Sequence, residues 1–131
     1  MTILRKLILA LGLGMIALLF VACGESSPKD VAIAFTEDVY KGNGDKLIKY
    51  INLSKKEKEM KEVIEGKLKA AATKAERKAQ ESDGIEKIEV VSEDVKEEKA
   101  IIKVLVRFKN GSENDETIKL IKVDDEWKIN L

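Results

Sequence analysis

The first apolar stretch of the chain runs for sixteen residues, from Leu7 to Ala22, and contains no charge. Arg5 and Lys6 precede it. A helix of this length spans roughly 24 Å at about 1.5 Å per residue, which is short for a membrane core of about 30 Å. A basic start, an apolar run of this length and a small final residue are typical of a secretory signal peptide. We therefore expect residues 1–22 to be a signal peptide, with an uncleaved signal anchor as the alternative.

The next apolar residues recur at helical spacing. Ser27 followed by Pro28 predicts the N-cap and the first turn of a helix. Gly42 suits the left-handed conformation that follows a helix end, and Asp45 is placed to cap a short second helix. The apolar positions of these two helices are Val31, Ala32, Phe35 and Val39, and then Leu47, Ile48 and Ile51.

A longer helix is predicted to follow. Ser54 and Glu57 have the spacing of a capping box, and Ser82-Asp83-Gly84 marks the end of the helix. The apolar side of the helix consists of Met60, Val63, Ile64, Leu68, Ala71, Ala72, Ala75 and Ala79. The alanines indicate close packing or a surface position near the end, and Gly66 weakens the helix in its middle.

From Ile85 onward the apolar period changes to two, which is typical of strands. The adjacent Val90 and Val91 indicate a bulge in the first strand, and Ala100 to Phe108 give the clearest alternation. Asn110-Gly111 predicts a hairpin that leads to a third strand over Thr117–Val123. After a turn at Asp124-Asp125, a fourth strand is expected to point Trp127, Ile129 and Leu131 inward. Helices followed by strands predict an α+β fold, with the N-terminal helices packed on a four-stranded antiparallel sheet.

The charges balance, with 24 Lys+Arg and 24 Asp+Glu. Residues 1–22 carry two bases and no acid, so their removal leaves a net charge of −2. A near-neutral chain has no overall field to attract nucleic acid, and we expect no such partner. Histidine, the commonest general base and metal ligand, is absent, and we expect neither a metal site nor a cofactor. The single cysteine excludes an intrachain disulfide.

The segment Leu19-Phe20-Val21-Ala22-Cys23-Gly24 resembles the lipobox of bacterial lipoproteins. Ala22 matches the small residue before the cleavage point and Cys23 the cysteine that is lipidated, whereas Phe20 replaces the usual leucine. The resemblance implies a diacylglycerol thioether on Cys23 with a further acyl chain, and two or more chains give durable membrane anchoring. Residues 23–27 would then be a lipidated tether on the cell membrane. Gly24 is not the aspartate that retains many lipoproteins there, which favours the outer membrane where the host has one.

Residues 28–131 resemble the lumazine-binding-like domain of bacterial lipoproteins, a domain of unassigned function. The likeness rests on four segments in order, residues 28–35, 41–46, 88–93 and 124–129. Asn43-Gly44 departs from the family's single-glycine turn. The family belongs to the nuclear transport factor 2-like superfamily, whose cystatin-like arrangement wraps a curved sheet around a long helix and leaves a cone-shaped cavity. The resemblance thus implies a pocket, for which we consider a lining of Phe35, Tyr50 and Val104.

Enzymes on this fold commonly place an acid, a tyrosine or a histidine inside the cone. The candidates here are Asp38, Tyr40, Asp45, Tyr50 and Trp127. Each has a simpler interpretation: Asp45 as a helix cap, the tyrosines as core-edge aromatics whose hydroxyls reach water, Trp127 as core, and Asp38 as a solvated side chain. A catalytic acid or base needs a partner and a shifted pKa, and no partner stands at a meaningful spacing. We therefore expect no enzyme.

Three classes of function remain open. The first is a non-catalytic module at the cell envelope that binds a small ligand or an envelope protein. The second is a structural or accessory subunit that pairs through its sheet, as in a homodimer, and the third is an enzyme that uses the cone. On the outer sheet face, Ile101 and Leu105 stand among basic residues and are too sparse to indicate an interface. The bases on the long helix are interrupted by acids, which favours a solvated face over a lipid-binding one.

Overall fold

Helix α2 (Pro28–Tyr40) begins at the residue that the sequence predicts. The computed structural model describes residues 27–53 and 58–131, so the predicted signal peptide, Cys23 and the Ser54–Glu57 capping box lie outside the described residues. The Ser27 hydroxyl accepts a hydrogen bond from the Asp30 backbone N–H, and the Asp30 carboxylate accepts one from the Ser27 N–H. These two bonds satisfy helix-terminal donors that would otherwise lack partners.

The second helix is a 3₁₀ helix, η1 (Gly44–Tyr50), and it is not capped as predicted. Gly42 has the expected left-handed backbone, with φ of +76°. Asn43 takes the N-cap position without a side-chain bond to the helix, and Asp45 lies inside the first turn. The predicted Asp45 cap is therefore wrong, because the helix begins one residue before Asp45. Ile51 follows the helix and forms a parallel bridge to Ile129.

Helix α4 (Lys61–Glu81) passes through Gly66 without a break and ends at the Ser82-Asp83-Gly84 segment, as predicted. Its alanines divide between two environments. Ala72 and Ala79 are buried in the core, whereas Ala71 is exposed and Ala75 half-buried. Gly44 lets η1 approach this helix closely, because a Cβ at Gly44 would lie 2.6 Å from the Lys69 Cα.

The sheet contains four antiparallel strands in the order β1 (Ile85–Lys96), β2 (Lys99–Phe108), β3 (Glu113–Val123) and β4 (Glu126–Ile129). A register shift between Val90 and Ser92 confirms the predicted bulge. Asp124 and Asp125 both have positive φ, the conformation of the tight hairpin turns that match strand twist. Strand β3 begins four residues before the predicted Thr117.

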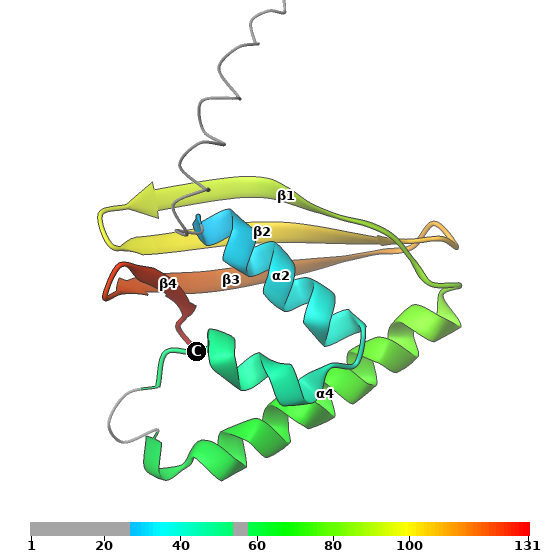
Figure 1. The fold of residues 1–131 in the computed structure, drawn as a ribbon. Coiled ribbons are helices and arrows are strands. Elements are labelled where there is room, and N and C mark those ends of the chain that lie inside the picture. Colours follow the sequence, from blue (N-terminus) through cyan, green and yellow to red (C-terminus); the bar gives the residue numbers. More distant parts are fainter. Residues whose placement is uncertain (1–26, 54–57) are drawn as a thin grey trace, which may run out of the picture.

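The helices lie on one side of the sheet, with α2 across its inner face and α4 against α2 and η1 (Figure 1). Every second residue of β2 points into the core, and all five are at most 2% exposed: Ala100, Ile102, Val104, Val106 and Phe108. This confirms the α+β architecture and the strongest strand pattern. Leu131 was expected to point inward, but it is 67% exposed because β4 ends at Ile129.

Candidate functional site

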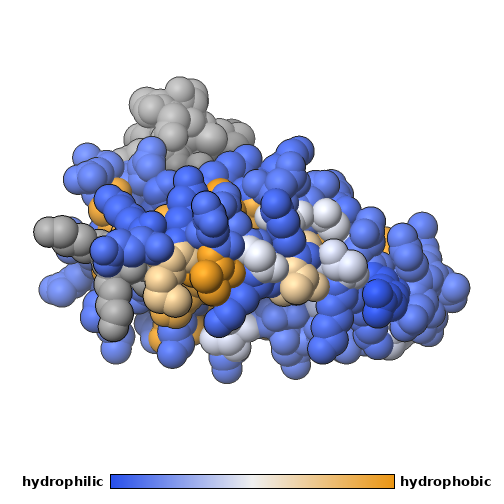
Figure 2. Space-filling view, turned by 90° about the horizontal axis from the view of Figure 1, so that it is seen from below, coloured by the Kyte–Doolittle hydropathy of each residue, from blue (hydrophilic) through white to orange (hydrophobic). Residues whose placement is uncertain are grey.

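A half-open groove runs between α4 and β3, beneath α2. Its volume is about 480 Å³, which is within the usual range of small-ligand pockets. Its walls are mostly apolar, and the residues that line it come from every layer of the fold: Phe35, Thr36, Val39, Tyr40, Leu47, Leu68, Ala71, Glu116, Thr117, Ile118, Lys119, Ile129, Asn130 and Leu131. On the face that carries α4, Figure 2 shows apolar surface bordered by hydrophilic side chains.

The groove follows from the way α4 packs. Its most extensive contacts are with η1 and α2, and α2 covers β1, β2 and β4. Helix α4 meets the sheet at its C-terminal end, where Ala79 packs with Val106 and Phe108. Helix α4 presents Leu68 and Ala71 to the groove. The small side chain of Ala71 leaves space on this side of the helix.

Tyr40 forms the polar end of the groove. Its hydroxyl donates a hydrogen bond to Glu116 Oε2 (2.8 Å) and accepts one from Asn114 Nδ2 (2.6 Å). Asn114 also donates to the same carboxylate oxygen at 3.0 Å. Burial, followed by the Glu116 charge and hydrogen bond, raises the pKa of Tyr40 to about 12, although the Asn114 bond acts in the opposite direction. Tyr40 is 4% exposed, so the prediction that its hydroxyl reaches water is wrong.

Beyond Tyr40 the groove continues as a shallower hollow with a basic rim. Lys74, Ala75 and Lys78 of α4 face Asn114 and Glu116 of β3 across it. The Lys78 ammonium also lies 5.7 Å from the centre of the Phe108 ring. Among the described residues, the ion pairs are Lys87–Glu89, Arg107–Glu113 and Lys128–Glu126, so neither rim lysine is in one of them. The groove thus joins an apolar floor to a basic end.

A second polar cluster lies at the corner between α2 and η1. Asp38 accepts hydrogen bonds from the Tyr50 hydroxyl (2.7 Å) and from Asn43 Nδ2 (3.0 Å). Burial raises the pKa of Asp38, but these two bonds and the nearby Lys46 and Lys49 outweigh it and lower the pKa below its ordinary value. Burial and then the Asp38 carboxylate raise the pKa of Tyr50 to about 12.

The structure separates the three residues considered for the pocket lining. Phe35 lies in the groove wall. Tyr50 packs edge-on against Phe35, with ring centres 5.7 Å apart, but it belongs to the Asp38 cluster and does not line the groove. Val104 is fully buried in the core, because α2 covers the part of β2 that carries it. Trp127 is half-buried and packs against the core.

Sequence reasoning missed Asn114 and Glu116, which form the polar end of the groove. Both precede Thr117, where the third strand was expected to begin. They share the inward-facing register of Ile118 and Leu120, and they pair with Val106 and Val104 of β2. A period-two pattern extended backward from Ile118 would have placed two polar residues on the inner face and marked them as candidates.

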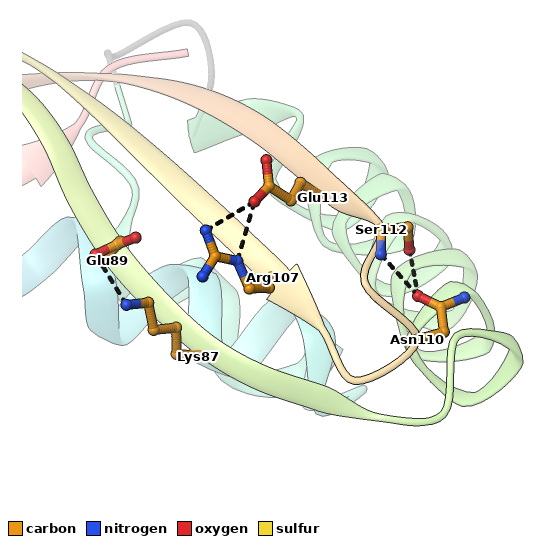
Figure 3. A network of polar contacts seen from close by, with 6 residues as sticks. All are labelled: Lys87, Glu89, Arg107, Asn110, Ser112 and Glu113. Atoms are coloured by element: carbon orange, nitrogen blue, oxygen red, sulfur yellow. Dashed lines mark hydrogen bonds and ion pairs between the residues drawn. The ribbon is translucent and has the colours of Figure 1, made fainter.

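The outer face of the sheet is polar near the β2–β3 hairpin (Figure 3). The Arg107 guanidinium binds Glu113 through two nitrogens, each 2.9 Å from the carboxylate. Lys87 pairs with Glu89 at 3.4 Å, and Asn110 accepts two hydrogen bonds from Ser112 in the turn. Exposed pairs of this kind contribute less than about 1 kcal/mol, so they shape the surface more than they stabilise it.

Two further properties concern the described residues alone. Residues 27–53 and 58–131 contain no cluster of three or more acidic or cysteine side chains suited to a metal ion. In the same ranges, no helix has the length and apolarity needed to span a membrane.

Comparisons with known proteins agree with this architecture. No curated protein matches the chain. A solved structure from Campylobacter jejuni, named "Putative NTF2-like transpeptidase", is similar over 81% of this chain and 99% of its own, with a TM-score of 0.73 and 29% sequence identity. That similarity supports the expected nuclear transport factor 2-like fold, while the narrower lumazine-binding-like resemblance stays a prediction. A family model, "Domain of unknown function (DUF4878)", matches residues 21–130. The chain belongs to this DUF4878 family.

Proposed function

We propose that this chain is a lipid-anchored, non-catalytic module of the cell envelope that binds an apolar group in the groove between α4 and β3. The observation that carries the binding role is the groove itself. The groove has a volume of about 480 Å³, lies between packed elements and has mainly apolar walls. Binding is favourable when a ligand removes apolar walls of this kind from water. Ligand pockets typically combine such walls with a few polar groups.

Residue chemistry at the groove favours binding over catalysis. A general base works best with a pKa near the working pH, whereas burial and the Glu116 carboxylate raise the pKa of Tyr40, at the polar end of the groove, to about 12. The Thr36 hydroxyl, at the groove wall, donates to the Ala32 carbonyl in its own helix. The name of the Campylobacter neighbour suggests acyl transfer, but the residues that line this groove include neither serine nor cysteine.

The groove is tested with the soluble domain, residues 24–131. Both core clusters are formed by residues between Val31 and Ile129, so the domain carries its own core. We expect the apolar fluorophore N-phenyl-1-naphthylamine to bind and to become brighter. Ala71→Phe fills the groove and should weaken binding about tenfold or more, which is about 1.4 kcal/mol.

The matched control is Ala70→Phe, the same change at an exposed neighbour on α4 that does not line the groove. It should leave the dissociation constant within about twofold, a change of about 0.4 kcal/mol. If both variants weaken binding equally, or if the wild-type domain does not bind the fluorophore, the groove is not a binding site.

The anchoring part of the proposal rests on Cys23, at the end of the apolar run. Four residues separate Cys23 from Pro28, where α2 begins. At roughly 3.5 Å per residue, they would keep the domain within about 15 Å of the lipid surface. Cys23→Ser should accumulate as an unprocessed precursor without incorporated radioactive palmitate. A variant protein of mature size that still carries the label would contradict the anchor.

A further inference from the structure

One edge of the sheet borders the groove. Strand β4 pairs with β3 from Leu120 to Val123, whereas β2 pairs with β3 from Glu113 to Ile121. The part of β3 from Glu113 to Lys119 therefore has a strand on one side only, and we call it the free edge. An edge of this kind presents backbone donors and acceptors to which another strand can bind.

The hydrogen bonds of β3 show which residues point toward the free edge. Asn130 N–H donates to the Lys119 carbonyl on the β4 side (2.8 Å), and Lys122 N–H donates to the Glu98 carbonyl on the β2 side (2.8 Å). Because this direction alternates along a strand, Asp115 and Thr117 share the orientation of Lys119. Their N–H and C=O groups face away from β2, and in the part of the chain that the structure describes no strand lies opposite them.

The free edge and the groove are parts of one surface. Four consecutive residues of β3, Glu116 to Lys119, line the groove. Successive side chains of a strand point to opposite faces, so a continuous run of lining residues indicates that the strand is presented edge-on. Leu68 and Ala71 form the opposite wall. Strand β1 also has a free edge, but it contains two register irregularities, and such bulges disrupt further pairing.

The charges at the groove favour an acidic group in the occupant. Lys74 and Lys78 are exposed at the basic end. Three acids of β3 lie near this end. Glu113 pairs with Arg107, Asp115 points to the exposed outer face of the sheet, and Glu116 accepts hydrogen bonds from Tyr40 and Asn114. An acidic side chain placed between the two lysines would gain from both ammonium groups, and such complementarity sets the orientation of a bound chain.

We propose that the groove binds an extended segment of a partner protein that adds a strand to the free edge of β3. The segment pairs with the backbone of Asp115 and Thr117, directs alternate apolar side chains toward Leu68 and Ala71, and places an acidic residue at the Lys74–Lys78 end. In this mode the backbone bonds supply affinity and the alternate side chains supply selectivity. The inference rests on the groove being a binding site and names its occupant.

The test uses an immobilised array of nine-residue peptides. Alternate positions carry Val, Ile, Leu or Phe, and the intervening positions carry Thr, Ser, Asp or Lys. The soluble domain should be retained most strongly by peptides with Asp near one end. Thr117→Pro removes a donor that faces the free edge without removing a bond to β2, and it should reduce retention at least about tenfold, or about 1.4 kcal/mol.

Two controls keep the result decisive. Circular dichroism and urea unfolding report whether Thr117→Pro folds. The strongest peptide, remade with N-methyl groups at alternate residues, loses donors without any change in the protein and should also bind at least about tenfold more weakly. The full chain in detergent should give the same ranking of peptides.

Three outcomes overturn the inference. One is that no alternating peptide is retained above scrambled controls. Another is that a folded Thr117→Pro domain, or the N-methylated peptide with the wild-type domain, binds as tightly as the unmodified pair. The third is concentration-dependent dimerisation of the domain that Thr117→Pro abolishes, which would make a second copy the occupant. If N-phenyl-1-naphthylamine still binds in an Ala71-dependent manner, the groove remains a ligand site and only the strand addition fails.

Discussion

Replacing Tyr40 by Phe tests the polar end of the groove, because it removes one oxygen atom and leaves the ring in place. The hydroxyl donates to a carboxylate and accepts from an amide. Hydrogen bonds to charged groups contribute about 1.5–3 kcal/mol, and the half-buried position of Glu116 reduces this. We expect Tyr40→Phe to lower the free energy of unfolding by about 1–2 kcal/mol near pH 8.

The same difference should shrink at alkaline pH. The folded protein raises the pKa of Tyr40 from 10.0 to about 12, so it favours the protonated hydroxyl. The resulting stability is complete below pH 10 and is lost as the pH rises toward 12. At pH 11, one unit above the unfolded pKa, the wild type should have lost about 1.4 kcal/mol from this group. Tyr40→Phe has no such group to titrate.

The assay is urea unfolding of the soluble domain at pH 8 and pH 11, followed by circular dichroism. Tyr50, whose pKa is also raised to about 12, is common to both proteins, so its contribution largely cancels in the difference. The stability advantage of the wild type should fall by about 1.4 kcal/mol between the two pH values. An advantage that stays constant would refute the buried, raised-pKa state of Tyr40.

Three further changes test the packing and the second polar cluster. Gly44→Ala should destabilise the domain by about 1–3 kcal/mol in urea, because its Cβ would meet the Lys69 Cα at 2.6 Å; an unchanged midpoint would refute this close approach. Gly66→Ala, where a Cβ meets nothing within 4 Å, should stabilise α4 by about 0.5–1 kcal/mol, and a loss of stability would contradict an open position. Asp38→Asn should flatten the acid limb of a stability–pH curve. A lowered carboxylate pKa stabilises the fold at pH values above the ordinary pKa of 3.8, and this stability is lost as the pH falls. An unchanged acid limb would argue against the Tyr50 and Asn43 bonds.

The sheet was the most predictable part of the fold, because burial of one face of β2 produces an alternation of apolar and polar residues. Ala100 to Phe108 alternate between buried and outward positions, and Asp124-Asp125 adopt the positive φ of a two-residue hairpin turn. The N-terminal cap at Ser27 was also predictable, since its hydrogen bonds are local. The Asp45 cap failed, because Asn43 and Asp45 are both suitable residues and tertiary packing of Gly44 against α4 decides between them.

The candidate site was less predictable because it depends on distances between elements. Phe35 lies in the groove wall, but nothing in the local sequence indicates that α4 packs mainly on η1 and α2 and leaves β3 open on one side. The bond between Tyr40 and Glu116 joins residues 76 positions apart, and no spacing rule covers such a pair. Val104 lies in the buried core and not in the groove, and only the position of α2 determines which part of the sheet is covered.

Methyl-resolved nuclear magnetic resonance of the soluble domain, titrated with N-phenyl-1-naphthylamine, locates the bound apolar group in the molecule. If the groove between α4 and β3 binds it, the shifts will be concentrated on methyl groups of the groove, those of Leu47, Leu68, Ile118, Ile129 and Leu131. Shifts confined to exposed methyl groups outside it, those of Val91, Val95 and Ile101, or an unchanged spectrum, would contradict it.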